Sequence, residues 1–131
     1  MHGDEAIDVV RRAYEANARH DVEGMLALFL DDIEIVEPES LPYGGIYHGK
    51  TAVYRLREGL MAAWSGFVCE VLEYTVRDDV VVAIIAVDAV ARKSGRPIVL
   101  RIAERWEVLN GRVKRITPFY FDTHAVRQAL A

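Results

Sequence analysis

The 131-residue sequence has a single cysteine, and this scarcity limits its covalent and metal chemistry. Cys69 cannot form an internal disulfide, so a reducing, cytoplasmic setting is the expected one. The four histidines are scattered without the spacing of metal ligands, so no metal is expected. No glycine-rich phosphate loop follows a predicted strand, and for that reason no nucleotide or other cofactor is expected.

Basic blocks and long apolar runs are also lacking. With 16 basic and 20 acidic side chains the formal charge is −4, which is not the electrostatic footprint of a nucleic-acid-binding protein. The longest apolar run, Val80 to Ala91, is too short to cross a bilayer as a helix and contains Asp88. We therefore expect one soluble domain over residues 1–131, with neither nucleic acid nor membrane as partner.

The first half of the chain predicts two helices and a strand. Residues 5–19 follow a helical period, and Asp21 can cap a second, short helix that carries apolar residues on its buried side. These apolar residues are Met25, Leu26, Leu28 and Phe29. Residues 33–37 alternate in polarity and predict a short strand, which Pro38 ends because it cannot donate to a ladder.

A loop and a third helix follow this strand. Residues 39–49 are rich in glycine and proline and predict an ordered loop. Apolar residues then recur at spacings of three, four and four, which predicts a helix ended by Ser65-Gly66. These residues are Val53, Leu56, Leu60 and Trp64.

The second half of the chain has the pattern of long strands. Four are expected, joined by short turns that make neighbours antiparallel: Phe67–Arg77, Val80–Arg92, Pro97–Leu109 and Arg112–Asp122. The second of these strands is apolar at nearly every position, so both of its faces need a cover. The helices can cover one face. A second copy of the chain is the economical cover for the other, which predicts a homodimer through the outer face of the sheet.

Pairing across a two-residue Ser94-Gly95 loop predicts which side chains share a face. In that register Asp88 lies opposite Arg101, as a cross-strand ion pair, and Glu104 lies opposite an apolar residue. Glu104 then stands among apolar neighbours, where desolvation favours the protonated carboxyl and raises its pKa. The structural alternative is that an arginine pairs with Glu104, or that it lies near the rim of the sheet.

The last hairpin has two possible registers. With a two-residue Asn110-Gly111 turn, one set of side chains points toward Glu104: Arg115, Thr117, Phe119 and Phe121. With a three-residue loop and a bulge at Gly111, the other set does: Ile116, Pro118, Tyr120 and Asp122. Composition does not decide between the two registers.

The order of these elements, with short motifs along them, resembles the nuclear transport factor 2-like (NTF2-like) superfamily. The similarity is narrower to its branch of ketosteroid isomerases and SnoaL-like polyketide cyclases. It covers essentially the whole chain and is carried by these motifs: His20-Asp21-Val22-Glu23, Asp31-Asp32, Glu37-Pro38, Tyr47-His48-Gly49, Asn110-Gly111-Arg112-Val113 and Phe119-Tyr120-Phe121-Asp122. The resemblance implies an α+β cone, in which three N-terminal helices pack on a strongly curved, mainly antiparallel sheet around an apolar pocket. It also implies a homodimer.

The resemblance further implies roles for four residues. Glu37 occupies the place of the isomerase's general base, Glu104 that of its protonated oxyanion-hole acid, and Tyr14 that of its oxyanion tyrosine, displaced by one residue. Asp122 matches the acid/base residue of SnoaL-like cyclases, which favours the bulged register with Tyr120 in the pocket wall. Two structural alternatives stay open, because Glu37 can be a solvated acid at a strand end and Asp122 can cap a final helix.

The predicted function is carboxylate general acid/base catalysis, of isomerase, cyclase or hydrolase type, on a small hydrophobic carbonyl, enol or epoxide. Five further residues are candidates for lining the pocket: His48, Trp64, Ile102, Trp106 and Tyr120. His48 has an alternative role as an anchor for its loop. The competing function is a non-catalytic module that binds a hydrophobic small molecule or forms a dimer.

Overall fold

The structure is a computed structural model that describes residues 2–131. It has four helices: α1 (His2–Ala18), α2 (Val22–Leu26), α3 (Lys50–Ala63) and α4 (Thr123–Leu130). It has six strands: β1 (Phe29–Glu37), β2 (Gly45–His48), β3 (Trp64–Arg77), β4 (Val80–Ala91), β5 (Pro97–Leu109) and β6 (Arg112–Tyr120). No helix among these residues is both long and apolar enough to cross a bilayer.

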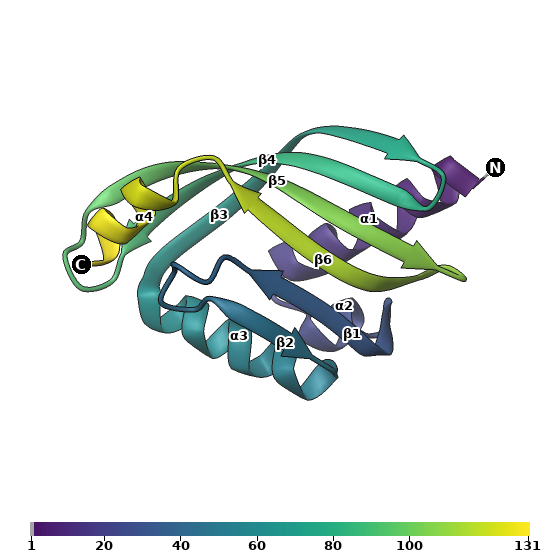
Figure 1. Ribbon diagram of the computed structural model, residues 1–131, viewed down its shortest axis with the longest axis horizontal. Helices are drawn as coiled ribbons and strands as arrows, with labels where there is room; N and C mark the ends of the chain where they lie inside the picture. The colour runs from purple at the N-terminus through teal and green to yellow at the C-terminus, as the bar shows by residue number, and fades with distance from the viewer. Residues whose placement is uncertain (1) are drawn as a thin grey trace.

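The six strands form one curved sheet in the order β2-β1-β6-β5-β4-β3. Every neighbouring pair is antiparallel except β1 and β6, which are parallel. Figure 1 shows α1 and α2 behind the sheet, α3 below it beside β2, and α4 at the end opposite the N-terminus. This arrangement confirms the predicted α+β fold, with three helices packed on a curved, mainly antiparallel sheet.

The first 30 residues confirm one prediction from local sequence and contradict another. Asp21 is the N-cap of α2, and its carboxylate accepts a hydrogen bond of 2.9 Å from the Gly24 amide, as predicted. The helix ends at Leu26, however, so the expected helical position of Phe29 is wrong. Phe29 begins β1 instead, where it is fully buried and packs edge-on against Trp106 at 6.5 Å.

The region around α3 differs from expectation at both ends. The predicted loop of residues 39–49 contains strand β2, which pairs with the end of β1. At the other end the helix stops at Ala63, and Trp64 has the extended backbone of the first residue of β3. The helical spacing of Trp64 was therefore a coincidence of sequence. Its buried side chain belongs to strand β3 and not to helix α3.

The β4–β5 hairpin keeps the predicted faces but not the predicted register. Asp88 lies opposite Val99, not Arg101, and Glu104 lies opposite Ala83. The loop holds four residues instead of two, since the Ala91 amide donates to the carbonyl of Arg96 and the Gly95 amide to that of Ala91. A shift of two residues leaves every side chain on its predicted face, because strand side chains alternate with a period of two.

The β5–β6 hairpin combines the two alternatives that the sequence left open. Asn110 and Gly111 both have positive φ, and Leu109 pairs with Arg112 across a two-residue turn. The register then shifts by one residue between Glu107 and Val108 on β5, which is the mark of a bulge. As a result Ile116, Pro118 and Tyr120 share the face of Glu104, the outcome that the bulged loop had predicted.

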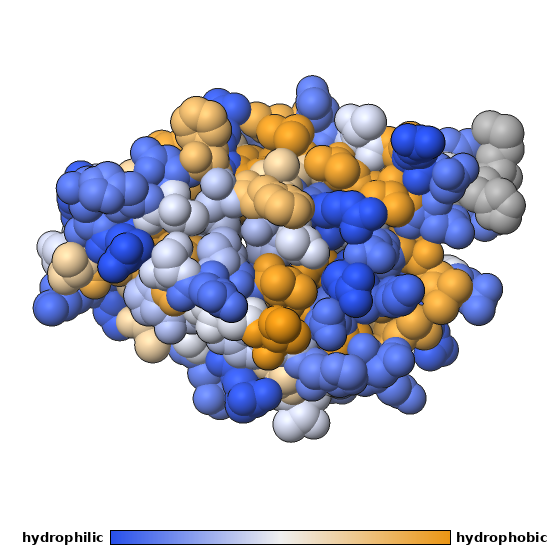
Figure 2. All heavy atoms as spheres, in the orientation of Figure 1, coloured by the Kyte–Doolittle hydropathy of each residue, from blue (hydrophilic) through white to orange (hydrophobic). Residues whose placement is uncertain are grey.

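The two faces of β4 are unequally covered in the single chain. Residues on the concave face are buried under the helices: Val81, Ala83, Ile85, Val87, Ala89 and Ala91. Apolar residues on the convex face, such as Val82 and Ile84, keep part of their surface accessible. In Figure 2 apolar side chains gather over β4 and β5 in the upper part of the view. The predicted cover for this face, a second copy of the chain, stays a prediction.

Candidate active site

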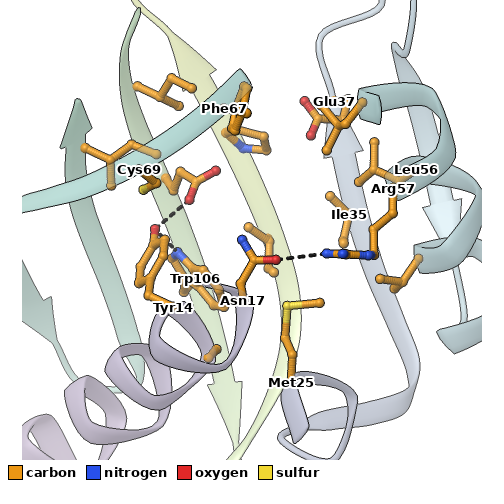
Figure 3. A pocket seen from close by; sticks show the side chains of 18 of the residues that line it. Tyr14, Asn17, Met25, Ile35, Glu37, Leu56, Arg57, Phe67, Cys69 and Trp106 are labelled. Atoms are coloured by element: carbon orange, nitrogen blue, oxygen red, sulfur yellow. Dashed lines mark hydrogen bonds between the residues drawn. The ribbon is translucent and has the colours of Figure 1, made fainter. Parts of the chain in front are cut away.

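A cavity of about 140 Å³ lies between the concave face of the sheet and helices α1 and α3. Side chains from helices α1 to α3, from β1 and from the strands β3 to β6 line it, most of them apolar (Figure 3). Three predicted site residues, Tyr14, Glu37 and Glu104, line this cavity together. Their arrival in one cavity from three separate elements is what the predicted acid/base site requires of the fold.

Glu37 is a buried acid without a hydrogen-bond partner. It is the last residue of β1 before Pro38, and it is only 6% exposed. Its Oε1 atom is fully buried and accepts no hydrogen bond from any residue that the structure describes. Burial, and secondarily the proximity of Glu104, raises the pKa of Glu37 to about 8. The alternative of a solvated strand-end acid is therefore wrong.

Glu104 is held by a short chain of hydrogen bonds. The hydroxyl of Tyr14 donates to Oε1 of Glu104 at 2.5 Å, and Nε1 of Trp106 donates to the same hydroxyl at 3.0 Å (dashed lines in Figure 3). Burial raises the pKa of Glu104, and the bond from Tyr14 offsets part of that rise. The predicted apolar surroundings are present, and the partner of Glu104 is a tyrosine rather than an arginine.

The Tyr14 hydroxyl is committed to this chain. Burial and the neighbouring Glu104 both raise the pKa of Tyr14, so the hydroxyl stays protonated. Since its hydroxyl donates to Glu104 and accepts from Trp106, Tyr14 has little capacity left for a ligand. It is therefore a positioning residue in this structure, and Glu104 Oε2 is the atom of the pair left without a hydrogen bond from Tyr14.

Tyrosines form a second hydrogen-bonded chain near Glu37. The hydroxyls of Tyr120 and Tyr43 lie 3.0 Å apart, and Nε1 of Trp64 donates to Tyr43 at 3.3 Å. Tyr120 lines the cavity, and burial, with Glu37 as the next cause, raises its pKa. This chain supplies a second neutral tyrosine hydroxyl in the cavity wall, that of Tyr120.

The other predicted site residues divide into two groups. Ile102, Trp106 and Tyr120 line the cavity. Trp64 is not among the described residues that line it, and its Nε1 donates to Tyr43, whose hydroxyl bonds to that of Tyr120. His48 is exposed on β2 and lies 3.8 Å from Glu34, so its expected place in the pocket wall is wrong. A strand of alternating exposure directs it outward.

Asp122 also lies outside the cavity, so the prediction that it faces the pocket is wrong. It lies two residues after the end of β6 and is the N-cap of α4, where its carboxylate accepts a hydrogen bond of 3.0 Å from the Ala125 amide. The strand ends at Tyr120, and the alternation that would have turned Asp122 inward ends with it. The alternative role as a helix cap is confirmed.

Sequence reasoning missed three polar or reactive cavity residues: Asn17, Arg57 and Cys69. Arg57 lies four residues after Val53 and three before Leu60, so the helical period placed it on the lining face. Cys69 lies opposite Val87 on the inward face of β3, and burial raises its pKa to about 12, which leaves it a neutral thiol. In the part of the chain that the structure describes, no three metal-ligating side chains come together.

The arrangement provides two neutralised carboxyls across an apolar space. A carboxyl with a pKa near 8 can accept a proton near neutral pH, and a neutral carboxylic acid can donate a hydrogen bond to a developing negative charge. These are the two functions that removal of a proton beside a carbonyl requires.

Comparisons with known proteins relate this architecture to others. The profile of the SnoaL-like domain family matches residues 10–116. An NTF2-like protein of unknown function from Burkholderia pseudomallei superposes with a TM-score of 0.91 at 24% identity, over 97% of this chain and 98% of the other. TerC, co-crystallized with polyporic acid, gives 0.90 at 21% identity over 96% and 98%. A putative SnoaL-like polyketide cyclase from Jannaschia sp. CCS1 gives 0.85 at 14% identity over 98% and 93%.

Proposed function

The chain belongs to the SnoaL-like domain family, and from this premise we propose that it is an enzyme of general acid/base type. In this proposal Glu37 removes a proton from the carbon beside a carbonyl or enol of a small hydrophobic substrate. Glu104 donates a hydrogen bond to the oxygen that becomes negative. The observation that carries the proposal is the buried, unpartnered carboxyl of Glu37 facing the same cavity as a hydrogen-bonded second acid.

Glu37 is suited to the role of general base because its carboxyl has no hydrogen-bond partner among the described residues. With a pKa of about 8, about one-tenth of the molecules carry the carboxylate at pH 7, and that carboxylate is strongly basic. The carboxyl makes no hydrogen bond with the described residues, so it can take up a proton without the loss of an existing bond. The rate is expected to rise with pH and to level off above pH 8.

Glu104 is suited to the acid because its position is fixed. Tyr14 holds one carboxyl oxygen, and burial favours the neutral form, whose proton then belongs on the other oxygen. An enolate oxygen placed against Glu104 accepts that hydrogen bond while Glu37 holds the abstracted proton. Return of the proton from Glu37 to a different carbon completes an isomerisation, and no external reactant is consumed.

The size and lining of the cavity limit the substrate. A space of about 140 Å³ is close in size to a cavity that holds one benzene ring, and its walls are mainly apolar. The related TerC was crystallised together with polyporic acid, which is consistent with a small organic ligand for this fold.

Hydrogen–deuterium exchange tests the proposal without knowledge of the natural substrate. The wild-type protein in D₂O is expected to accelerate exchange of the protons beside the carbonyl of 1-indanone, followed by NMR. Glu37→Gln is expected to lower this acceleration by about 10²- to 10⁴-fold, because it removes the base. Binding of 1-indanone should change by less than about threefold. Glu39→Gln, an exposed acid two residues away, is the matched control.

Two results would contradict this function. Equal exchange rates for wild type and Glu37→Gln would remove Glu37 from the chemistry. Binding of 1-indanone to the wild type without any accelerated exchange would favour the second candidate, a non-catalytic module that holds a hydrophobic ligand.

We also propose that two copies pair through the convex face of the sheet. Three large apolar side chains on this face are widely exposed, namely Val68, Val99 and Phe119. A double variant, Val68→Lys with Val99→Lys, is expected to shift the protein from dimer to monomer in sedimentation equilibrium. Ile46→Lys, equally exposed but on the edge strand β2, is the control. A wild-type monomer at high concentration would refute this pairing.

A further inference from the structure

The cavity opens toward a groove that carries positive charge. This outer groove, of about 310 Å³, shares four lining residues with the cavity: Asn17, Arg57, Leu60 and Phe67. Its remaining wall includes His20, Trp64 and Arg92. Two arginines and a histidine line it, and no aspartate or glutamate does.

Arg57 stands where the cavity and the outer groove meet. It extends from α3, and its Nη1 donates a hydrogen bond of 2.9 Å to Oδ1 of Asn17 on α1, as Figure 3 shows. Among the described residues no carboxylate oxygen lies within 4 Å of its guanidinium nitrogens. A guanidinium has five N–H donors, so Arg57 keeps donors in excess of the bond to Asn17.

Arg92 is the second arginine of the outer groove, and its guanidinium is fixed in place. Its Nε donates to the carbonyl of Met61 at 2.8 Å and its Nη2 to that of Trp64 at 3.1 Å, which ties the guanidinium to the end of α3. Its positive charge is thereby fixed beside the outer groove, where it adds to the field of Arg57. Two guanidinium groups that both keep unused N–H donors are a suitable pair for an acidic group.

The remaining ionisable side chains of the cavity do not oppose an anion. Burial raises the pKa of Glu37 and of Glu104, so both favour the uncharged acid. The thiol of Cys69 and the hydroxyls of Tyr14 and Tyr120 are also neutral. Arg57 is therefore the one formal charge that most of the molecules carry in the cavity wall at pH 7.

We propose that the outer groove is an anion subsite, in which Arg57 binds an acidic oxygen group, such as a carboxylate, on a substrate whose apolar body fills the cavity. This inference rests on the proposed function, because it assigns the substrate class of the same cavity. The substrate is then amphipathic, with its reacting carbon near Glu37 and its acid at the mouth. Guanidinium binds a carboxylate through two parallel hydrogen bonds, which also fixes the direction of entry.

A pair of ligands that differ only in charge tests this subsite. Naphthalene-2-carboxylate and naphthalene-2-carboxamide have nearly the same shape, and their affinities are measured by calorimetry at pH 7 and low salt. The wild type is expected to bind the carboxylate about tenfold more tightly than the amide, since a half-buried charged hydrogen bond is lost in the amide. This preference should shrink with added salt.

Three variants test whether Arg57 causes the preference for the carboxylate over the amide. Arg57→Gln is expected to bind the carboxylate and the amide equally, and Arg57→Lys to keep part of the preference as a point charge. Arg55→Gln, an exposed neighbour on α3, is the matched control and should behave as the wild type. Arg57→Lys keeps the charge and is used if Arg57→Gln fails to fold. A reduced preference for the carboxylate in Arg57→Lys then identifies Arg57 as its source.

The results separate this inference from the catalytic proposal. Glu37→Gln is expected to lose exchange of 1-indanone yet keep the preference for the carboxylate. A wild type without preference, or an undiminished preference in Arg57→Gln, would overturn the anion subsite and leave the role of Glu37 untouched. Loss of catalysis alone would leave the subsite standing.

Discussion

Glu37 and Glu104 are the same residue type in the same cavity, yet their surroundings differ. Glu104 on β5 receives a hydrogen bond from Tyr14, which Trp106 in turn supports. Glu37 at the end of β1 has a buried oxygen atom with no partner. Burial raises the pKa of both carboxyls, so desolvation alone does not distinguish them.

The difference lies in what holds each carboxyl in place. A hydrogen-bonded acid is oriented in advance and can stabilise charge without reorganisation, which is what an oxyanion site needs. A buried carboxylate without a hydrogen-bond partner is poorly stabilised, so it binds a proton strongly, which is what a base needs. In the proposed function the two identical side chains have opposite tasks, and the hydrogen bond from Tyr14 is what distinguishes them.

The largest expected effect concerns the cost of burying Glu37. The folded chain binds the Glu37 proton more tightly than the unfolded chain, so stability falls as pH rises between the two pKa values, about 4.5 and about 8. Relative to Glu37→Gln, the wild type is expected to lose up to about 5 kcal/mol of unfolding free energy over this window. Urea denaturation at several pH values measures the difference.

Glu39→Gln serves again as the control, since an exposed acid should show no such window. A stability difference between wild type and Glu37→Gln that stays constant from pH 4.5 to pH 8 would mean that Glu37 is not desolvated in solution.

The next largest effect is expected when Tyr14, the hydrogen-bond partner of Glu104, is replaced. Tyr14→Phe leaves Glu104 and the buried Nε1 of Trp106 each without a partner, and is expected to cost about 1–3 kcal/mol of stability. Since the lost bond lowers the pKa of Glu104, that pKa should rise further, as a carboxyl ¹³C titration would show. Tyr74→Phe, on the adjacent ring, is the control. An unchanged Glu104 titration in Tyr14→Phe would refute the link between them.

The smallest effect concerns the third predicted acid. Asp122→Ala is expected to cost about 1 kcal/mol through loss of the α4 cap, and Asp122→Asn to retain most of that stability. Exchange of 1-indanone should stay within twofold of the wild type in both variants. A large loss of exchange in a stable Asp122→Asn protein would return Asp122 to the site.

The sequence predicted the faces of the sheet better than its registers. Alternation along β4 and β5 put Glu104 among inward-facing apolar residues, and this survived a register error of two because the period is two. The β5–β6 register depended on a bulge opposite Glu107 and Val108, which no turn motif announces. Only packing across the whole sheet settles such a shift.

The candidate site was predicted where family resemblance and local pattern agreed. Glu37, Glu104 and Tyr14 reach one cavity, while His48 and Asp122 were assigned from motifs and lie outside it. Arg57 was missed because a charge on an apolar stripe was not given weight. The pairing of Tyr14 with Glu104 joins residues ninety positions apart, a contact that only the folded chain defines.

The most direct test of the central claim is a ¹³C NMR titration of the side-chain carboxyls, with Glu37→Gln and Glu104→Gln used for assignment. The account predicts that Glu37 titrates near pH 8 and that Glu104 titrates above the ordinary range of a glutamate. Ordinary, independent titration of both carboxyls between about pH 4 and 5 would contradict it.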